Sequence, residues 1–266
     1  MPKRVQSPSS IKTYNQCPRK YYYTYILEIE TPPNIHQVRG NIAHSVLEHF
    51  FDIDTGTIFM ENYELHLKLV VQQLLLKEWQ YAKPKLNKIE LTHDQQIFYF
   101  EETLTMLFNW LESFCAKLSK QKGTFQERFK HLTPEREQLF ISEKYNAKGI
   151  IDAIENQGDG TIRLMDYKTS SNENLNEHLL QLAIYCLLYF DKNGQMPKQA
   201  GVYFLKGKEA LIDVDEKLLE MAKKEIEHVH SATETADVNH YPKDPGPLCK
   251  WSSGHCAFYD ICRPHE

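Results

Sequence analysis

The hydrophobic pattern of this chain changes character near Pro134, and that change constrains the fold more than any other feature of the sequence. Before it, apolar residues recur every three or four positions, most clearly over residues 94–118, which is the pattern of a long amphipathic helix. Shorter helices are predicted after the capping pair Ser9-Ser10 and over residues 41–52. The first half of the chain is therefore expected to be helical.

Short segments rich in β-branched residues follow Pro134, and turn residues such as the run Asn156-Gln-Gly-Asp-Gly160 separate them. They predict three strands, of which the last two form a hairpin, and then a helix, a fourth strand and a final helix. The ranges are 139–145, 148–155, 161–168, 173–191, 201–206 and 214–230. Helices before and after a small sheet indicate a mixed α/β fold.

No linker divides the chain before the Pro-rich segment 241–248, so a single domain is predicted over residues 1–266. Within it, we expect a helical insertion over about 53–133, a core containing the sheet over about 134–231, and a cysteine-rich tail over about 241–266.

Two aspartates and a lysine form the main candidate for a chemical site. Asp166 and Lys168 are two residues apart in a predicted strand, so their side chains share a face. If the hairpin turns about Asp159, the numbers of paired residues sum to 318 and Asp152 lies opposite Asp166. Opposed side chains have Cβ atoms about 4.5–5.5 Å apart, so two negative charges there call for a cation between them.

A divalent cation meets this need, because Mg²⁺ and Mn²⁺ take oxygen ligands from carboxylates, water and phosphate. Lys168 could then hold or deprotonate an attacking water, and the arrangement indicates metal-assisted hydrolysis of a phosphodiester. An Asp-x-Lys pair in a strand is also typical of an exposed ion pair, and a register shifted by one residue would turn Asp152 to the other face.

Three further side chains could serve the same site. His44 begins the second turn of its predicted helix, where an imidazole could complete a metal shell, although a lone histidine is more often structural. Gln181 and Tyr185 are four residues apart on one helical face, from which they could reach a phosphate or a base, or Tyr185 could simply pack. Glu143, on the predicted strand before Asp152, is expected to have a supporting role at most.

The six cysteines are unevenly distributed along the chain. Cys115 and Cys186 lie on apolar helical faces and are expected to be buried. The others lie near the two ends of the chain, and clustered thiols in a reducing compartment indicate a metal site more than disulfides. They are Cys17, Cys249, Cys256 and Cys262. Four thiolates suit either zinc or an iron–sulfur cluster, and their spacing does not choose between them.

The charge distribution is compatible with a local surface for nucleic acid but is more typical of an ordinary solvated face. A net charge of −5 argues against a protein that binds nucleic acid over its whole surface. Residues 1–27 nevertheless carry five cations, Lys3 among them, and no acid, while residues 116–148 carry eight cations and four acids. Such runs contact phosphates or form an ordinary solvated face. No secretory signal or membrane-length apolar run occurs, so we expect a cytoplasmic protein without membrane contact.

Five ordered segments of the chain resemble the motifs of the PD-(D/E)XK nuclease superfamily, specifically its RecB-like branch. That branch includes the AddB nuclease domain of bacterial helicase–nucleases and the CRISPR-associated adaptation nucleases. The segments are SPSSIKTYNQCPRKY at 7–21, RGNIAH at 39–44, GIID at 149–152, DYKT at 166–169 and QLAIY at 181–185. The resemblance covers most of the chain and implies a restriction-endonuclease-like mixed sheet flanked by helices.

The resemblance also implies a metal-dependent deoxyribonuclease, and among its members an exonuclease on single-stranded DNA ends. His44, Asp152 and Asp166 would hold Mg²⁺ or Mn²⁺, and Lys168 would serve the attacking water. Gln181 and Tyr185 match the branch's Gln-x-x-x-Tyr motif, for which catalytic and DNA-binding roles are expected. Further DNA contacts are expected from Arg19, Lys20, Arg39 and the tyrosines at 21–23 and 25, whose rings could stack on unpaired bases.

For the terminal cysteines, the resemblance implies a [4Fe–4S] cluster held by one upstream and three downstream thiolates. In the usual pattern two residues separate the first downstream pair, whereas here six separate Cys249 from Cys256, and five separate Cys256 from Cys262. The insertion Ser252-Ser-Gly-His255 leaves open a zinc site, or one in which His255 replaces a thiolate.

The resemblance leaves the partners open. No Walker A loop occurs in the sequence, so a helicase motor would be a separate protein, and a CRISPR adaptation partner is an alternative. A DNA-end-binding or assembly subunit with an architectural cluster and weak cleavage is a second interpretation. A zinc-stabilised protein whose motifs are accidental is a third.

Overall fold

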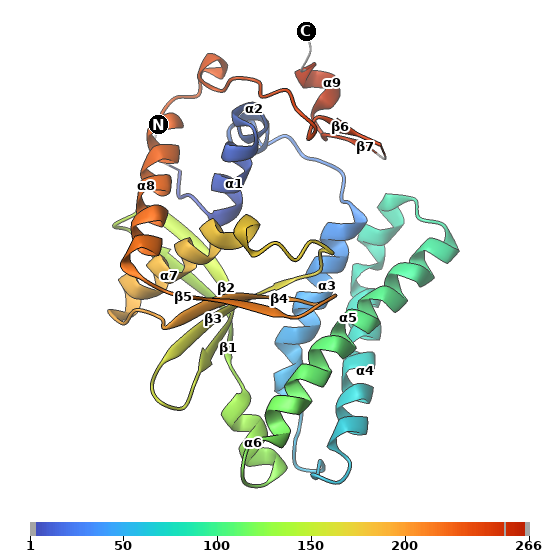
Figure 1. Cartoon of the computed structure of the whole chain (residues 1–266). Coiled ribbons are helices and arrows are strands. Elements are labelled where there is room, and N and C mark those ends of the chain that lie inside the picture. Colours follow the sequence, from blue (N-terminus) through green and yellow to red (C-terminus); the bar gives the residue numbers. More distant parts are fainter. Residues whose placement is uncertain (1–3, 253, 264–266) are drawn as a thin grey trace.

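The computed structural model describes residues 4–252 and 254–263, so Lys3 and Ser253 lie outside the described residues (Figure 1). The sheet contains strands β1 (Glu135–Ser142), β2 (Ala147–Asn156), β3 (Ile162–Lys168), β4 (Gln199–Phe204) and β5 (Glu209–Asp213), in that spatial order. Neighbouring strands are antiparallel except β3 and β4, which are parallel. The mixed α/β class predicted from the sequence is confirmed.

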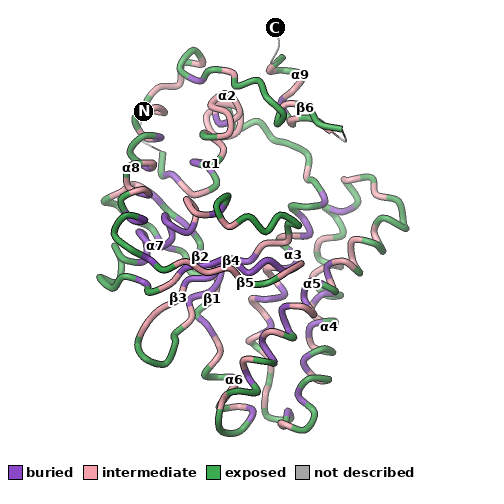
Figure 2. The backbone as a smooth tube through the Cα atoms, in the orientation of Figure 1, coloured by how far each residue is buried: buried purple, intermediate pink, exposed green. Residues whose placement is uncertain are grey.

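Helices cover both faces of this sheet. On one side lie α3 (Ile35–His49), α4 (Tyr63–Leu86), α5 (His93–Ser119) and α6 (Phe125–Leu132), and on the other lie α1 (Pro8–Gln16), α7 (Leu179–Asn193) and α8 (Glu216–Ala232) (Figure 1). Each layer has its own apolar core. Met165 and Tyr167 of β3 pack toward α3 and α5, whereas Leu164, their neighbour on the same strand, packs toward α7. Figure 2 shows the buried backbone concentrated along the central strands and the inner helices.

Local sequence accounts for where several helices begin and end. Ser7 caps α1 by accepting a hydrogen bond from the Ser10 amide, and Thr92 caps α5 in the same way through Gln95. Helix α7 ends at Gly194, whose φ of +68° is readily adopted by glycine. The helix predicted over 94–118 is confirmed as α5, and the one predicted over 173–191 begins as a 3-10 turn, η4 (Leu175–His178), before α7.

The first downstream strand differs from the prediction. Strand β1 covers Glu135–Ser142 and not residues 139–145, so the prediction that Glu143 lies on a strand is wrong. A tight turn replaces the predicted strand end, because the amide of Asn146 bonds to the carbonyl of Glu143 at 3.3 Å and the amide of Tyr145 bonds to Ser142 Oγ at 3.2 Å. Glu143 is exposed in that turn. Strand β5 was not predicted, because its half-buried segment carries no strong alternation.

The C-terminal segment of the chain lies against residues 17–26, near the N-terminus in sequence. The segment after α8 contains the 3-10 turn η5 (Val238–His240), a hairpin of β6 (Lys250–Trp251) and β7 (Gly254–His255), and α9 (Tyr259–Cys262), and it passes over α2 (Pro18–Tyr21) and the π-helix η1 (Tyr22–Ile26) (Figure 1). Arg19 ties the two segments, since its Nε donates to the Tyr241 carbonyl at 2.7 Å. Within residues 4–252 and 254–263, no helix combines the length and apolarity needed to cross a membrane.

Candidate functional site

Three carboxylates lie in a row across neighbouring strands. The β2–β3 hairpin pairs Ala153 with Met165, which is the register that sums to 318, so the predicted register is confirmed. The ladder ends at that pair, and beyond it Oδ2 of Asp152 accepts the hydrogen bond of the Tyr167 amide at 2.7 Å. Asp152 therefore bonds directly to the segment of β3 that carries Asp166.

Strand β1 contributes the third carboxylate, Glu137. The pairs Arg136–Ala153 and Gln138–Ile151 flank it, so it lies opposite Asp152. Its φ of +46° is left-handed, which is uncommon for a residue other than glycine, costs about 1–3 kcal/mol and persists only where the surrounding structure imposes it. Backbone in this conformation is frequent at functional sites.

Opposite the left-handed Glu137, the regular alternation of β2 side chains between the two faces of the sheet is interrupted. Ile151 packs in the core beside α7, whereas Ala153, two residues later, packs in the core beside α3. A regular strand would place both on one face. The break turns Glu137 and Asp152 together toward α3, which supplies His44.

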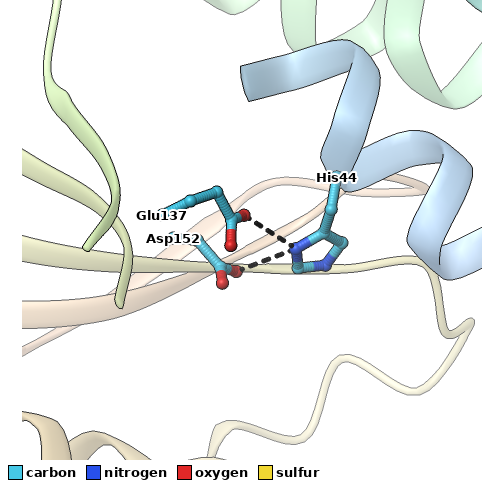
Figure 3. A group of neighbouring side chains, drawn as sticks. All are labelled: His44, Glu137 and Asp152. Atoms are coloured by element: carbon cyan, nitrogen blue, oxygen red, sulfur yellow. Dashed lines mark ion pairs between the residues drawn. The ribbon is translucent and has the colours of Figure 1, made fainter. Parts of the chain in front are cut away.

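The imidazole of His44 faces both carboxylates through one ring nitrogen, as Figure 3 shows. Its Nδ1 is 3.4 Å from Oδ2 of Asp152 and 3.6 Å from Oε1 of Glu137. Its Nε2 lies 2.9 Å from the Tyr167 carbonyl, which only accepts, so Nε2 carries a hydrogen and Nδ1 faces the carboxylates. Burial disfavours the protonated ring, but hydrogen bonds to Asp152 and Glu137 outweigh it and raise the pKa of His44 to about 10.

Asp166 is almost completely buried, with 1% of its surface exposed. Nζ of Lys168 lies 2.7 Å from its Oδ2, and Nε2 of Gln181 donates to its Oδ1 at 2.8 Å. Burial and the carboxylate of Asp152 raise the pKa of Asp166, while Lys168 opposes the shift. Among the described residues, Oδ2 of Asp166 accepts no hydrogen bond of good geometry despite its burial, as expected of an oxygen suited to a cation.

The geometry fits a hard divalent cation. Ligand atoms of His44, Glu137 and Asp152 all lie within 4.8 Å of one another, and Asp166 lies on the adjoining strand with its buried oxygen. Carboxylate oxygens with one imidazole nitrogen suit Mg²⁺ or Mn²⁺. Among the described residues, Asp166 is not a member of a three-ligand group of that size, so its place in the shell remains a prediction.

Gln181 and Tyr185 lie behind Asp166. Gln181 Nε2 donates to Asp166 and also to the hydroxyl of Tyr185, at 2.8 Å in each case. Tyr185 is only 6% exposed, and burial raises the pKa of its hydroxyl. The pair is therefore placed to orient the Asp166 carboxylate from the α7 side, and the predicted contact of these residues with DNA is untested.

The four terminal cysteines line one pocket, together with Lys20, Tyr23 and other residues of both chain ends. Between Cys249 and Cys256, Lys250–Trp251 and Gly254–His255 pair as the strands β6 and β7, and the Cys256 amide bonds to the Cys249 carbonyl at 2.9 Å, so the insertion leaves the backbones of these two cysteines adjacent. Burial raises the pKa of the Cys262 thiol, and the nearby Cys17 raises it further.

The spacing of these thiols is wide. Among the described residues, no three cysteines have sulfur atoms within 4.8 Å of one another. In a tetrahedral zinc site, bonds of about 2.3 Å place thiolates about 3.8 Å apart. His255 does not line the pocket, and its Nδ1 lies 3.0 Å from the Cys256 carbonyl. Cys115 and Cys186 are buried, as predicted.

The sequence profile of the PD-(D/E)XK nuclease superfamily matches residues 6–263. The chain belongs to this superfamily. The match includes every motif singled out in the sequence and extends to the last cysteine, and the resemblance noted from the motifs is thereby confirmed.

Individual relatives agree with this assignment. Two proteins named as subunits of an ATP-dependent helicase/deoxyribonuclease are similar to the chain: one from Streptococcus uberis, 25% identical over 222 residues, and one from Carboxydothermus hydrogenoformans, 26% identical over 249 residues. The matches cover 79% and 80% of this chain but 19% and 21% of the relatives, so the chain spans about a fifth of their length.

A solved structure shares the fold. The crystal structure titled "Putative exonuclease" from Eubacterium rectale aligns with a TM-score of 0.52 and 14% identity, covering 99% of this chain and 89% of that one. The alignment therefore spans the helical layer as well as the PD-(D/E)XK core.

Several residues expected to bind DNA have structural partners in this nuclease. Arg19 donates to the carbonyls of Tyr241 and Val238, and Lys20 lines the cysteine pocket. Tyr21 is completely buried and stacks on Tyr241 with ring centroids 6.1 Å apart, so its predicted role as a platform for bases is wrong, because packing of the chain ends covers the ring. In the second basic run, Lys117 pairs with Glu209 and Arg136 with Asp52.

Glu137 was not predicted from the sequence. Glu143 was considered instead, because the predicted strand covered residues 139–145, whereas the strand in the structure ends at Ser142. The turn at 143–146 would have identified Glu137, since a hairpin centred there places it opposite Asp152. Its left-handed backbone has no comparable sequence signature.

Proposed function

We propose that the chain is a metal-dependent deoxyribonuclease that removes nucleotides from single-stranded DNA ends. The observation that carries the proposal is the convergence of His44, Asp152, Asp166 and Lys168 at one end of the β2–β3 pair. The printed names of the relatives, which include deoxyribonuclease, and of the solved neighbour, a putative exonuclease, support the assignment to DNA and to its ends. The assignment to single strands rests on the motif resemblance alone.

His44, Asp152 and Asp166 would hold Mg²⁺ or Mn²⁺, with Glu137 as a further oxygen donor facing Nδ1 of His44. When bound, the ion would lower the pKa of its water and offset charge on the scissile phosphate. Cation binding would displace the proton from Nδ1, while the Tyr167 carbonyl continues to fix the ring through Nε2.

Lys168 has the chemistry to orient the attacking water. Its side chain is 24% exposed, so the ammonium that contacts Asp166 also reaches solvent. That position lets it hold a water beside the carboxylate and offset negative charge that develops on the phosphate. Gln181 holds the other oxygen of Asp166, which keeps the carboxylate oriented.

The test is cleavage of end-labelled DNA. Wild-type protein should shorten single-stranded DNA with Mn²⁺ or Mg²⁺ and leave blunt duplex largely intact, whereas Lys168→Ala should lose activity. Lys198→Ala, which changes an exposed lysine in the α7–β4 connection, serves as the matched control. Equal inactivity of wild type and Lys168→Ala across substrates and metals would refute the proposal, and digestion of RNA or of duplex alone would refute the substrate assignment.

For the terminal cysteines we propose a structural [4Fe–4S] cluster. The four thiols line one pocket, and the choice of an iron–sulfur cluster over zinc rests on the resemblance of the motifs to the RecB-like branch. The cluster would join the two ends of the chain beside the Arg19–Tyr241 contact. Anaerobic preparation followed by analysis for iron, sulfide and zinc separates the two metals: stoichiometric zinc without sulfide would contradict the proposal.

We further propose that the nuclease acts on strands opened by a separate helicase. The relatives are named as helicase/deoxyribonuclease subunits and are about five times longer than the matched region. Comparing a blunt duplex with the same duplex carrying single-stranded flaps tests this. Rapid cleavage of the flaps alone is expected, and equal rates on both substrates would remove the need for a motor.

A further inference from the structure

A pocket of about 440 Å³ lies beside the metal centre, and basic residues outnumber acidic ones in it. We call it the Arg39 pocket. The residues that matter for its chemistry are His36, Arg39, Glu102, Ser170, Ser171 and Lys206. None of them belongs to the predicted metal shell.

The pocket adjoins the catalytic strand ends. Ser170 and Ser171 follow Lys168 at the end of β3, and Lys206 follows the end of β4, whose Phe204 pairs with Lys168 in the parallel ladder. Arg39 precedes His44 by five residues on α3, a rise of about 7.5 Å along the helix.

Arg39 is an unusual residue to find buried. It is 3% exposed, and among the described residues its Nε has no hydrogen-bond acceptor. Its Nη1 forms an ion pair with Glu102, and its guanidinium carbon lies 5.5 Å from the centre of the Tyr99 ring. A buried cation is normally compensated by several hydrogen bonds. The guanidinium thus keeps donor capacity at the wall of a pocket.

The carboxylate of Glu102 forms ion pairs with two cations, Arg39 and Lys206. Its other oxygen lies 2.5 Å from Nζ of Lys206, which also donates to Ser171 Oγ at 3.2 Å. One carboxylate opposite two cations leaves a net positive charge at this point. Burial and the nearby Arg39 lower the pKa of Lys206, as expected of two cations that repel each other.

We propose that the Arg39 pocket binds a phosphate group of the nucleic-acid strand whose neighbouring phosphate lies at the metal centre. A guanidinium with a lysine and serine hydroxyls is a donor set suited to phosphate oxygens, and an anion would balance the excess charge. The inference rests on the proposed nuclease function. The phosphate is either an internal phosphodiester or a terminal phosphate.

The test measures binding of a labelled single-stranded oligonucleotide to the full chain over a KCl series, in EDTA so that cleavage does not occur. Lys206→Gln should lower the slope of log Kd against log salt by about 0.7, the value for one lost phosphate contact on a single strand. In cleavage assays with Mn²⁺, the KM of the Lys206→Gln variant for DNA should rise by a larger factor than its kcat falls. Lys208→Gln is the matched control, since Lys208 lies in the same loop, is exposed and does not line the pocket.

Arg39→Gln should produce the same change in slope. If this substitution of a buried residue prevents folding, the result for Lys206→Gln alone tests the proposal. A larger effect of Lys206→Gln on a 5′-phosphorylated oligonucleotide than on its 5′-hydroxyl form identifies a terminal phosphate, and equal effects identify an internal one. If Lys206→Gln leaves both the salt slope and KM unchanged while the wild type cleaves DNA, phosphate binding in the Arg39 pocket is refuted and the nuclease proposal is not. A changed slope without any cleavage refutes the nuclease proposal instead, and a wild type that binds no DNA overturns both.

Discussion

Nε2 of Gln181 donates a hydrogen bond to Oδ1 of Asp166 at 2.8 Å, which joins α7 to β3. The same amide group donates to the Tyr185 hydroxyl. Two motifs that are adjacent in sequence order are therefore one hydrogen-bonded unit in space. We propose that Gln181 positions the carboxylate through this contact.

Gln181→Leu should lower kcat by about 10- to 100-fold with little change in KM, because a displaced carboxylate misplaces the reacting groups. Steady-state cleavage of single-stranded DNA measures both constants. Tyr185→Phe removes only the hydroxyl that accepts the second hydrogen bond and should have a much smaller effect on kcat. A Gln181→Leu variant with raised KM and normal kcat would instead indicate contact with DNA.

Glu137→Gln should weaken Mn²⁺ binding by about 10-fold, because it removes a negative charge opposite Nδ1 of His44. Titration calorimetry with Mn²⁺ measures the affinity without reference to cleavage. Glu143→Gln makes the same chemical change in the exposed turn that ends β1 and should bind Mn²⁺ as the wild type does. Identical affinities for the two variants would exclude Glu137 from the site.

Cys262→Ser should reduce iron content, stability and DNA binding together. Since metal binding contributes directly to folding, a fall of about 5 °C in melting temperature is expected, equivalent to about 2 kcal/mol for a chain of this size. Cys115→Ala changes a buried cysteine outside the pocket and should keep full iron content. A Cys262→Ser protein with wild-type stability and activity would contradict a structural cluster.

His178 should make stability depend on pH. It is 7% exposed, and burial, reinforced by Lys168 and Lys12, lowers its pKa to about 4. The unfolded chain, with a histidine pKa of about 6.5, therefore binds more protons as the pH falls from about 6.5 to 4. The stability contribution of neutral His178 is complete above pH 6.5 and is lost over that interval, up to about 3 kcal/mol.

His178→Phe keeps a ring against Phe204 but does not titrate. Urea unfolding at pH 7 and pH 4.5 should show a smaller loss of unfolding free energy for this variant than for the wild type. Parallel losses in both proteins would show that His178 is not the residue responsible.

Much of the fold and of the metal centre could be predicted because periodicity and hairpin register are local properties. The turn about Asp159 placed Asp152 next to the Asp166 segment, and the structure has that register. Glu137 could not be found this way, because its side-chain direction depends on a left-handed backbone that tertiary packing imposes. The same limit applies to Tyr21, whose burial depends on contacts with Tyr241, far along the chain.

The residues of the Arg39 pocket, too, could be predicted only in part from the sequence. Arg39 belongs to a motif visible in the sequence, but Glu102 and Lys206 come from α5 and from the loop after β4. Their meeting depends on how α5 packs on the strand ends, which no local pattern specifies. Motifs thus predicted the candidate site residues, whereas the residues around them required the assembled fold.

In the proposed function, His44, Asp152 and Asp166 hold one divalent ion for phosphodiester hydrolysis. The most direct measurement is Mn²⁺ titration, followed by cleavage of end-labelled single-stranded DNA, for wild type and Asp152→Asn, with Asp159→Asn in the exposed hairpin turn as the control. We predict that Asp152→Asn alone loses tight Mn²⁺ binding and cleaves at least about 100-fold more slowly. An Asp152→Asn protein that binds Mn²⁺ and cleaves DNA like the wild type would contradict the account.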